Sequence, residues 1–336
     1  MQQDITDANI TGKQLFKIQL FALVAGAVIL LFKFGAYFLT HSNTIFTDAL
    51  ESIINVAAAA FALLSIYIAS QPTDADHPYG HGKVEFLSAG FEGILIMLAG
   101  GSIITKSVFA FFHPYTIENL NIGLAIVVGS GLANYGIGWW LQTYGKKHHS
   151  LTLQADGEHL KSDAYSSLAV LAGLLLVLLT GLRWIDNVAA ILIGTFILYT
   201  GAKLLRKSIA GIMDESDDEI VESIIKSISI HRKPQWIDVH NMRVIQYGSK
   251  WHVDCHVTLP WYYTLQQAHD EIEEIARLVN EQNADRVEFF IHADSCISAS
   301  CTVCSLQNCA HRKSLQNTSV EWNLENVKRN KKHGLV

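Results

Sequence analysis

Residues 155–167, ADGEHLKSDAYSS, lead directly into the apolar run LAVLAGLLLVLL of residues 168–179. A membrane-spanning helix needs about 20 mainly apolar residues, and this segment, extended to approximately 153–180, meets that requirement. His159 and Asp163 lie four residues apart, on one face of the predicted helix. A charge at membrane depth costs at least about 2.5 to 3.5 kcal/mol. We therefore interpret these two residues as metal ligands.

Five further stretches have a similar length and apolarity. They cover approximately residues 15–38, 45–69, 87–112, 120–143 and 186–206. We expect no cleavable signal, because the first stretch is too long for a signal h-region. Lysine and arginine concentrate in alternate loops, which by the positive-inside rule places both termini in the cytoplasm. The sequence predicts a six-helix, multi-pass protein of a bacterial-type inner (plasma) membrane.

Charge is distributed unevenly along the chain. Residues 86–145 carry only Glu92, Lys106 and Glu118, whereas residues 214–336 carry dense mixed charge. The formal net charge of −6 offers no basic surface for nucleic acid. The change in composition indicates a membrane domain joined to a water-soluble one. We expect a cytoplasmic N-terminus at 1–14, a transport domain at 15–207, a soluble domain at 208–295 and a tail at 296–336.

A second polar stripe occurs in the span at 45–69, which reads TDALESIIN at residues 47–55. Asp48, Glu51, Ser52 and Asn55 follow the spacing i, i+3, i+4 and i+7, so they share one helix face. Facing His159 and Asp163 across a bundle, this stripe would offer carboxylate and amide oxygens to a divalent transition metal. The alternative is that each stripe, including Asp48 and Asp156, only lines a helix end near the lipid headgroups.

The soluble part alternates between helical and strand-like patterns. A helix is predicted at 216–228, strands at 236–248 and 250–259 around a Gly-Ser turn, a helix at 264–282 and a strand at 286–293. The order is αββαβ, and it predicts a small α+β domain in which both helices cover one face of the sheet.

These features together resemble the cation diffusion facilitator family of divalent metal exporters. The resemblance spans about residues 12–296 and rests on six helices, the polar stripe of 47–55, the HxxxD of His159 and Asp163, the loop DADHPYGHGKVE and the soluble domain. It implies a transport site made of Glu51, Asn55, His159 and Asp163, with Asp48 as a further candidate. Zinc-exporting relatives typically carry His or Asp, Asp, His and Asp. Glu51 and Asn55 depart from that pattern and leave the metal open.

The resemblance also implies a homodimer that exports its metal by alternating access. Two acids, Glu51 and Asp163, balance one divalent cation, so protons must enter the site when the metal leaves. We expect zinc/proton antiport, with Fe²⁺, cobalt, nickel, cadmium or manganese as alternative substrates. In another class, the chain would be a membrane-anchored metal sensor or a zinc hydrolase without transport. Facing polar stripes favour a transporter over an enzyme.

Two further metal sites follow from the resemblance. Composition alone leaves the loop after residue 69 evenly divided between a metal site and a solvated turn, and the family pattern favours a site of Asp74, His77 and His81. In the soluble domain, which the family pattern makes metallochaperone-like, we expect zinc at the dimer interface. Its ligands would be His240, His256, His269, His292 and Asp294. Lys83 matches a lysine that pairs with an acid after the sixth helix, here Asp214, as a charge interlock; the alternative is an exposed cytoplasmic lysine.

The tail contains four of the five cysteines. Cys296, Cys301, Cys304 and Cys309 follow the spacing C-x4-C-x2-C-x4-C. Clustered thiols suit a metal in a reducing compartment better than a disulfide framework. A tetrahedral zinc site is favoured over a two-iron cluster, and an inert or disordered tail is the alternative. Residues 312–336 are polar and basic, so we expect a solvated extension whose lysines and arginines contact anionic membrane lipid.

Overall fold

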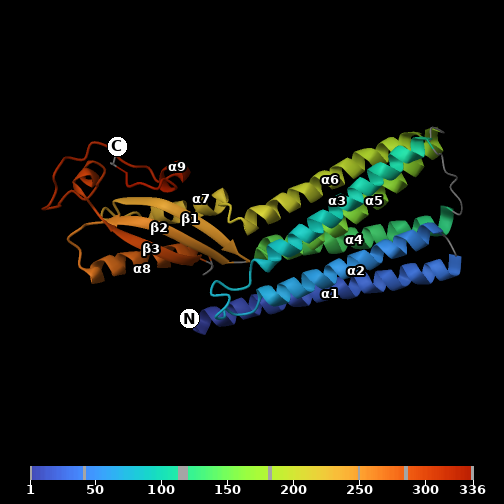
Figure 1. Ribbon diagram of the computed structural model, residues 1–336, viewed down its shortest axis with the longest axis horizontal. Helices are drawn as coiled ribbons and strands as arrows, with labels where there is room; N and C mark the ends of the chain where they lie inside the picture. The colour runs from blue at the N-terminus through green and yellow to red at the C-terminus, as the bar shows by residue number, and fades with distance from the viewer. Residues whose placement is uncertain are drawn as a thin grey trace. The chain divides into compact units, whose positions relative to one another are not determined.

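The chain divides into two compact units. The structure, a computed structural model, describes residues 2–40, 43–112, 120–180, 184–248, 250–283 and 287–333 (Figure 1). The first unit is Met1–Met213 and the second is Asp214–Val336. The division falls later than the predicted boundary at 207, because the last helix of the first unit continues to Ile212.

The first unit consists of helices joined by loops, among them the loop at residues 70–83. As predicted, six long helices occur there, and the fold class is confirmed. Four of them, α1, α2, α3 and α6, are long and apolar enough to cross a membrane. The helix starting nearest the N-terminus begins earlier than predicted, because the polar leader continues it. The helices are α1 (Gln2–Thr40), α2 (Asn43–Ala69), α3 (Val84–Phe112), α4 (Leu120–His148), α5 (Leu151–Thr180) and α6 (Trp184–Ile212).

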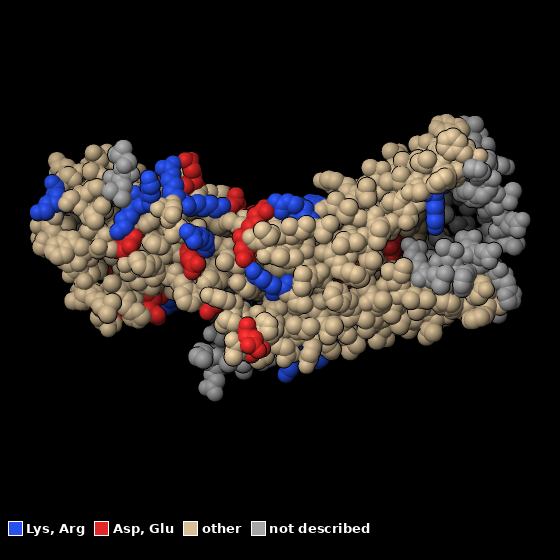
Figure 2. All heavy atoms as spheres, viewed as in Figure 1, with Lys and Arg blue, Asp and Glu red and all other residues tan. Residues whose placement is uncertain are grey.

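The outer surface of the helices is apolar. Large side chains such as Leu31, Phe32, Leu98 and Leu192 are more than half exposed. Figure 2 shows that charged side chains are sparse along the helices and gather elsewhere on the visible face. A contiguous apolar surface of this kind is unfavourable in water and suits contact with lipid. The first unit is therefore a membrane domain.

Glycines bring neighbouring helices into close contact. A Cβ atom added at Gly157 of α5 would lie 2.7 Å from the carbonyl oxygen of Gly138 on α4. At Gly201 of α6, an added Cβ would lie 2.8 Å from the carbonyl oxygen of Gly93 on α3. Small residues permit this approach, which drives helix association in a membrane. Gly157 and Gly93 each lie within two residues of an ionisable side chain of the membrane interior. The close helix contacts at these glycines therefore help to position those side chains.

The second unit has the predicted αββαβ order. Its described elements are α7 (Asp218–Ile230), β1 (Asp238–Tyr247), β2 (Lys250–Leu259), α8 (Leu265–Gln282) and β3 (Val287–Ser295). The sheet order is β1-β2-β3, with β1 antiparallel and β3 parallel to β2. A parallel pair needs a crossover connection, and α8 supplies it.

One face of the sheet forms the hydrophobic core. Alternate β2 residues such as Val253, Cys255 and Val257 are buried and pack with Ile224 of α7 and Ile275 of α8. The intervening positions of β2 point to the other face, because strand side chains alternate. Histidines therefore collect on the face away from the two helices.

The tail packs onto the soluble unit, which corrects the expectation of a solvated extension. It contains a 3-10 helix, η1 (Ser298–Thr302), and a short helix, α9 (Leu324–Val327). Trp322 and Val327 are buried in the same core as the sheet. The guanidinium of Arg232 lies 4.0 Å from the centroid of the Trp322 ring. Val320 and Leu324 pack against the same core, so the apolar residues between 320 and 327 dock this segment.

Candidate metal sites

The membrane cluster joins helices α2, α3 and α5 around one imidazole. The Nε2 atom of His159 lies 3.0 Å from Oδ1 of Asn55 and 3.9 Å from Oδ2 of Asp163. The Asn55 amide donates a hydrogen bond to that same Asp163 oxygen. His159 is 4% exposed. The predicted facing of the two polar stripes is therefore present for these three residues, whereas the side chains of Asp48 and Glu51 lie outside the part that the structure describes.

A fourth member of the cluster, Glu92, was missed by sequence reasoning. Its Oε2 atom lies 3.3 Å from Nδ1 of His159, and the side chain is fully buried within α3. Within the described residues its carboxylate oxygens make no hydrogen bond. The available signal was its isolation, because no other acid occurs between residues 86 and 117. Glu85 lies seven residues earlier on α3 and is also buried, but the predicted span began at residue 87 and so excluded this partner.

Glu92 lies behind the imidazole rather than beside Asp163. The two carboxylates approach different ring nitrogens of His159, and Glu92, His159 and Asp163 are not among the described groups whose three donor atoms lie within 4.8 Å of one another. A histidine that binds a metal usually donates its other N–H to a carboxylate or carbonyl, which fixes the ring and its tautomer. The geometry suits a metal at Nε2 and a supporting acid at Nδ1.

Asp156 is buried instead of lining a headgroup region. Its Oδ2 atom accepts a hydrogen bond of 2.6 Å from Nε2 of Gln19, which also donates to the carbonyl oxygen of Ala59. Asp156 is 2% exposed. It thus links α5 to α1 and α2 one turn before His159, and it helps to hold the polar face of α5 toward the helix interior.

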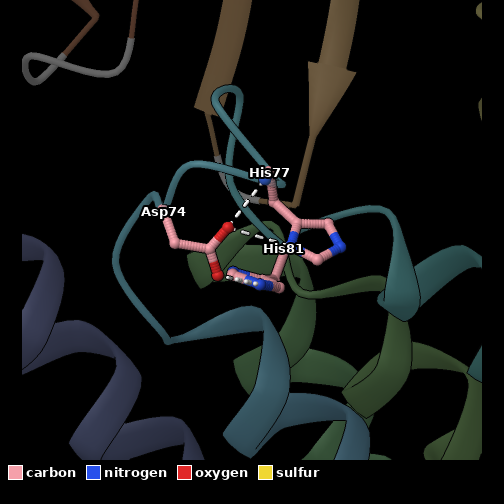
Figure 3. A group of neighbouring side chains, drawn as sticks. All are labelled: Asp74, His77 and His81. Atoms are coloured by element: carbon pink, nitrogen blue, oxygen red, sulfur yellow. Dashed lines mark hydrogen bonds and ion pairs between the residues drawn. The ribbon is translucent and has the colours of Figure 1, made fainter.

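The loop cluster consists of Asp74, His77 and His81 (Figure 3). Oδ1 of Asp74 lies 3.0 Å from Nδ1 of His77, and Oδ2 lies 3.3 Å from Nε2 of His81. Within the described residues, this group is one of two whose three donor atoms lie within 4.8 Å of one another. Figure 3 shows both imidazoles turned toward the single carboxylate. Such a set matches the ligands that zinc accepts.

Backbone geometry prepares the loop cluster. The N–H groups of Asp76 and His77 both donate to Oδ1 of Asp74, as in an Asx turn. The hydrogen bond from His77 holds the pKa of the Asp74 carboxyl below its ordinary value. Gly80 has a φ of +87°, a conformation that favours glycine and that brings His81 back toward Asp74. The carboxylate is therefore ionised and oriented at neutral pH.

The sheet cluster consists of His240, His256, His292 and Asp294. The strand register places His240 opposite His256 and His256 opposite His292, so the three imidazoles form a row across the sheet. Oδ2 of Asp294 lies 3.3 Å from His240 and 3.4 Å from His256, and Oδ1 lies 3.2 Å from His292. Three members, His240, His256 and Asp294, form the second compact donor group.

The tail reaches this cluster. Nζ of Lys332 lies 3.4 Å from Oδ2 of Asp294, and the His333 imidazole contacts Asp238, which itself lies 3.2 Å from His240. Burial alone would raise the pKa of the Asp294 carboxyl, but Lys332 and His256 outweigh it and lower that pKa. The ammonium group of Lys332 therefore lies next to Asp294, a candidate metal ligand.

The structure leaves two predicted contacts unsupported. His269 lies on the exposed side of α8, with its Nε2 atom 4.0 Å from Oε1 of Glu273, and it does not join the sheet cluster within this chain. Lys83 and Asp214 belong to different units. The assignment of His269 as a ligand and the pairing of Lys83 with Asp214 stay predictions.

The four tail cysteines line one cavity of the soluble unit, together with His311. All five cysteines of the chain are free thiols. No three of the tail sulfurs lie within 4.8 Å of one another in the described structure. Sulfurs around a single zinc ion would be about 3.8 Å apart, given Zn–S distances of about 2.3 Å in a tetrahedron. The sulfurs therefore lie farther apart than in a tetrahedral zinc site, and the predicted tail zinc stays a prediction.

Comparison with known proteins identifies the class of transporter. The chain matches the family models of the cation efflux transmembrane domain over residues 19–213 and the cation efflux protein cytoplasmic domain over residues 216–296. An uncharacterized transporter of Synechocystis is 33% identical over 250 residues, which cover 74% of this chain and 81% of that protein.

Two relatives carry more specific names. The manganese efflux system protein MneP of Bacillus subtilis is 27% identical over 285 residues, 83% of this chain and 95% of that protein. The cation-efflux pump FieF of Serratia proteamaculans is 27% identical over 283 residues, 82% of this chain and 91% of that protein. The chain belongs to the cation diffusion facilitator family, whose members are membrane transporters of divalent metal cations.

Proposed function

We propose that this transporter exports zinc from the cytoplasm in exchange for protons, as a homodimer that alternates between inward and outward access. The observation that carries the proposal is the membrane cluster, in which His159, Asp163 and Asn55 converge inside apolar helices. A buried imidazole and carboxylate away from water need a ligand that uses them. Glu51, on the same face of α2 as Asn55, would complete a four-ligand set.

Proton exchange follows from the cost of burying charge. When the cation leaves, the acids of the membrane cluster would stay in a medium of low dielectric constant, where uncompensated charge is strongly unfavourable. Ligands must be deprotonated to bind a metal, so metal binding releases protons and proton binding releases metal. His159 is suited to this exchange, because an imidazole changes charge near neutral pH. Glu92 adds an acid next to His159 that can share a proton with it.

The ligand set favours zinc, with manganese as the second candidate. An imidazole ligand and the general affinity order of divalent metals favour zinc over manganese. Manganese is supported by the oxygen-rich remainder of the set, with Asn55 in place of a second acid, and by the name of the Bacillus relative. Supply and site geometry decide selectivity between such metals.

The loop and sheet clusters would serve regulation rather than passage. Both are accessible from water, since His77 and His292 are more than half exposed at their side chains. We assign zinc to both clusters as a bound regulatory ion. We place both termini, the loop cluster and the sheet cluster on the cytoplasmic side of an inner membrane. Metal bound there would report its cytoplasmic concentration and stabilise the dimer by mass action.

Purified protein in liposomes tests this function directly. The pH of the lumen and the concentration of zinc are followed with separate dyes while a proton gradient is imposed. Zinc should move against its own gradient only while the proton gradient lasts, and manganese should compete weakly. Zinc flux that ignores the proton gradient would contradict antiport, and manganese flux that exceeds zinc flux would replace the proposed substrate.

A further inference from the structure

The thiol cavity, lined by Cys296, Cys301, Cys304 and Cys309, is a built site outside the transport machinery. It has a volume of about 270 Å³. It is partly open to solvent, since Trp261 and Ile297 in its lining are exposed. Three of its four thiols lie in residues 297–336, beyond the segments that match the family models, and Cys296 is the last residue of the matched segment. No residue of the membrane cluster or of the sheet cluster lines the cavity.

The chain around the cavity is held in a fixed shape. The guanidinium of Arg312 donates hydrogen bonds to four backbone carbonyl oxygens, at distances from 2.7 to 3.3 Å. Two of these carbonyls belong to Cys301 and Cys304, and the others to Leu306 and Ser314. One side chain thus closes the loop around the cavity. The thiols face it from a constrained backbone, not from a loose tail.

Backbone donors are aimed at two of the sulfurs. The N–H of Trp261 donates to Sγ of Cys296, and the N–H of Lys313 donates to Sγ of Cys301, both at 3.4 Å. Hydrogen bonds to a charged acceptor are roughly twice as strong as neutral ones, so these donors favour thiolates. Four sulfurs around one cavity, two of them facing backbone N–H donors, form a set of ligands for a metal centre.

The spacing of the sulfurs decides between kinds of metal centre. Since no three of them lie within 4.8 Å in the described structure, a single zinc ion would leave most of the cavity empty. Iron–sulfur clusters also take four cysteine thiolates, but the inorganic core keeps the thiolates apart and fills the space between them. We propose that the thiol cavity holds an iron–sulfur cluster ligated by Cys296, Cys301, Cys304 and Cys309.

The cluster would arrive already assembled from a thiolate-bound donor cluster. Each cysteine thiol replaces one donor thiolate on iron and gives its proton to that leaving thiolate, so the oxidation state of the iron does not change. Cluster binding would therefore make the folding of the tail depend on iron and sulfide. The tail also contains Lys332, which contacts Asp294 of the sheet cluster. The supply of iron and sulfide would therefore also affect the sheet cluster of the same unit.

The test uses the full-length protein, purified without oxygen. Iron, acid-labile sulfide and zinc are measured per chain in the wild type, in the double variant Cys301→Ser/Cys304→Ser and in Cys255→Ala. Cys255 is a matched control, because it is the fifth thiol and is buried in β2 away from the cavity. We expect iron and sulfide in equal amounts in the wild type and the control, with visible absorption typical of a cluster, and loss of both in the double variant.

Two results would overturn the proposal. If the wild type holds one equivalent of zinc and no sulfide, and the double variant loses that zinc, the cavity is a mononuclear zinc site instead. Equal metal and sulfide in all three proteins would show that the cavity binds neither. If the double variant fails to fold, wild-type protein stripped of metal is treated with a mixture of ferrous and ferric iron and with sulfide, before and after thiol alkylation. Absorption that develops equally in both samples would then exclude the cavity as the site.

Discussion

His159 in the membrane helices and His256 in the sheet each lie beside an aspartate, but their surroundings differ in every other respect. His159 is almost fully buried, with an acid at each ring nitrogen. His256 is one-third exposed at its side chain and belongs to a row of three imidazoles on an open sheet face. The same two ligand types thus occur in a sealed site and in an open one.

The difference indicates two kinds of metal binding. A sealed cluster can take up or release its ion only if the surrounding helices move, and alternating access requires such a movement. An open cluster exchanges its ion with the solution, so its occupancy follows the cytoplasmic concentration. The sealed site is supported by Glu92, whereas the open site is contacted by the ammonium of Lys332. The first arrangement strengthens a ligand, and the second competes with the metal.

Removal of a ligand from the sealed site should have the largest effect. His159→Ala and Asp163→Ala should each reduce zinc flux in liposomes more than about 100-fold, because loss of supporting groups alone typically costs 10- to 100-fold. Glu158→Gln is the matched control, since the Glu158 carboxylate, next to His159 on α5, contacts Gln142 and Lys161 instead of the cluster. Flux near the wild-type value in both ligand variants would remove the membrane cluster from the transport path.

Loss of the acid behind His159 should have the next largest effect. Glu92→Gln keeps the shape of the side chain but not its charge, so zinc affinity should fall about 10- to 100-fold. The dependence of flux on pH should also change, a readout that a packing role alone would not move. Glu92→Asp should recover part of both. If Glu92→Gln and the wild type share one affinity and one pH profile, Glu92 does not support the ligand.

Changes in the open site should alter regulation more than transport. His240→Ala and His292→Ala should raise the zinc concentration needed for half-maximal flux by about 10-fold, within the usual range of coupling energies of about 1 to 3 kcal/mol. Flux at saturating zinc should change little. A loss of flux that is equal at every concentration, with the dimer intact, would show that the sheet cluster does not sense metal.

A carboxylate at the neutral position of the sealed site should modify selectivity. In Asn55→Asp the new acid would face Asp163, and the metal-free site would need an additional proton. Zinc flux should therefore fall more steeply as pH is lowered, and the order of competition among zinc, iron, manganese and cobalt should change. An unaltered competition order together with an unaltered pH profile would place Asn55 outside the ligand set.

The smallest effect is expected at the lysine of the open site. Lys332→Met removes a partly exposed cation from Asp294, so the affinity of the sheet cluster for zinc should rise by about 2- to 5-fold. Lys331→Met serves as the control at the adjacent position. Titration calorimetry on both variants measures the change. Equal affinities in the two variants would mean that Lys332 does not compete with the metal.

The fold was largely predictable because its signals are repetitive. Six apolar runs and two strands of alternating pattern recur over many residues, so errors at single positions do not matter. The predicted helix at 264–282 is one example: Thr264 is its N-cap and forms a capping box with Gln267. The docking of the tail was missed, because the basic residues at 328–332 decided the interpretation of a segment that also holds the apolar residues Val320, Trp322, Leu324 and Val327.

The candidate sites were predictable only where their residues share one element. His159 and Asp163 repeat at helical spacing, and Asp74, His77 and His81 lie within one loop. Glu92 joins His159 from another helix, so only the tertiary structure could reveal the contact. His269 stays a prediction, because its residue type fits the family pattern but within this chain its helix lies on the other face of the sheet.

The central claim is that the buried membrane cluster holds the transported metal in exchange for protons. Zinc is titrated into detergent-purified wild type, His159→Ala and Glu158→Gln in two buffers of different protonation enthalpy, which gives the number of protons released per zinc bound. The wild type and Glu158→Gln should both bind zinc at the membrane cluster with release of protons. His159→Ala should lose this binding step but keep zinc binding at the loop and sheet clusters. The same number of zinc ions and protons in all three proteins would contradict the claim.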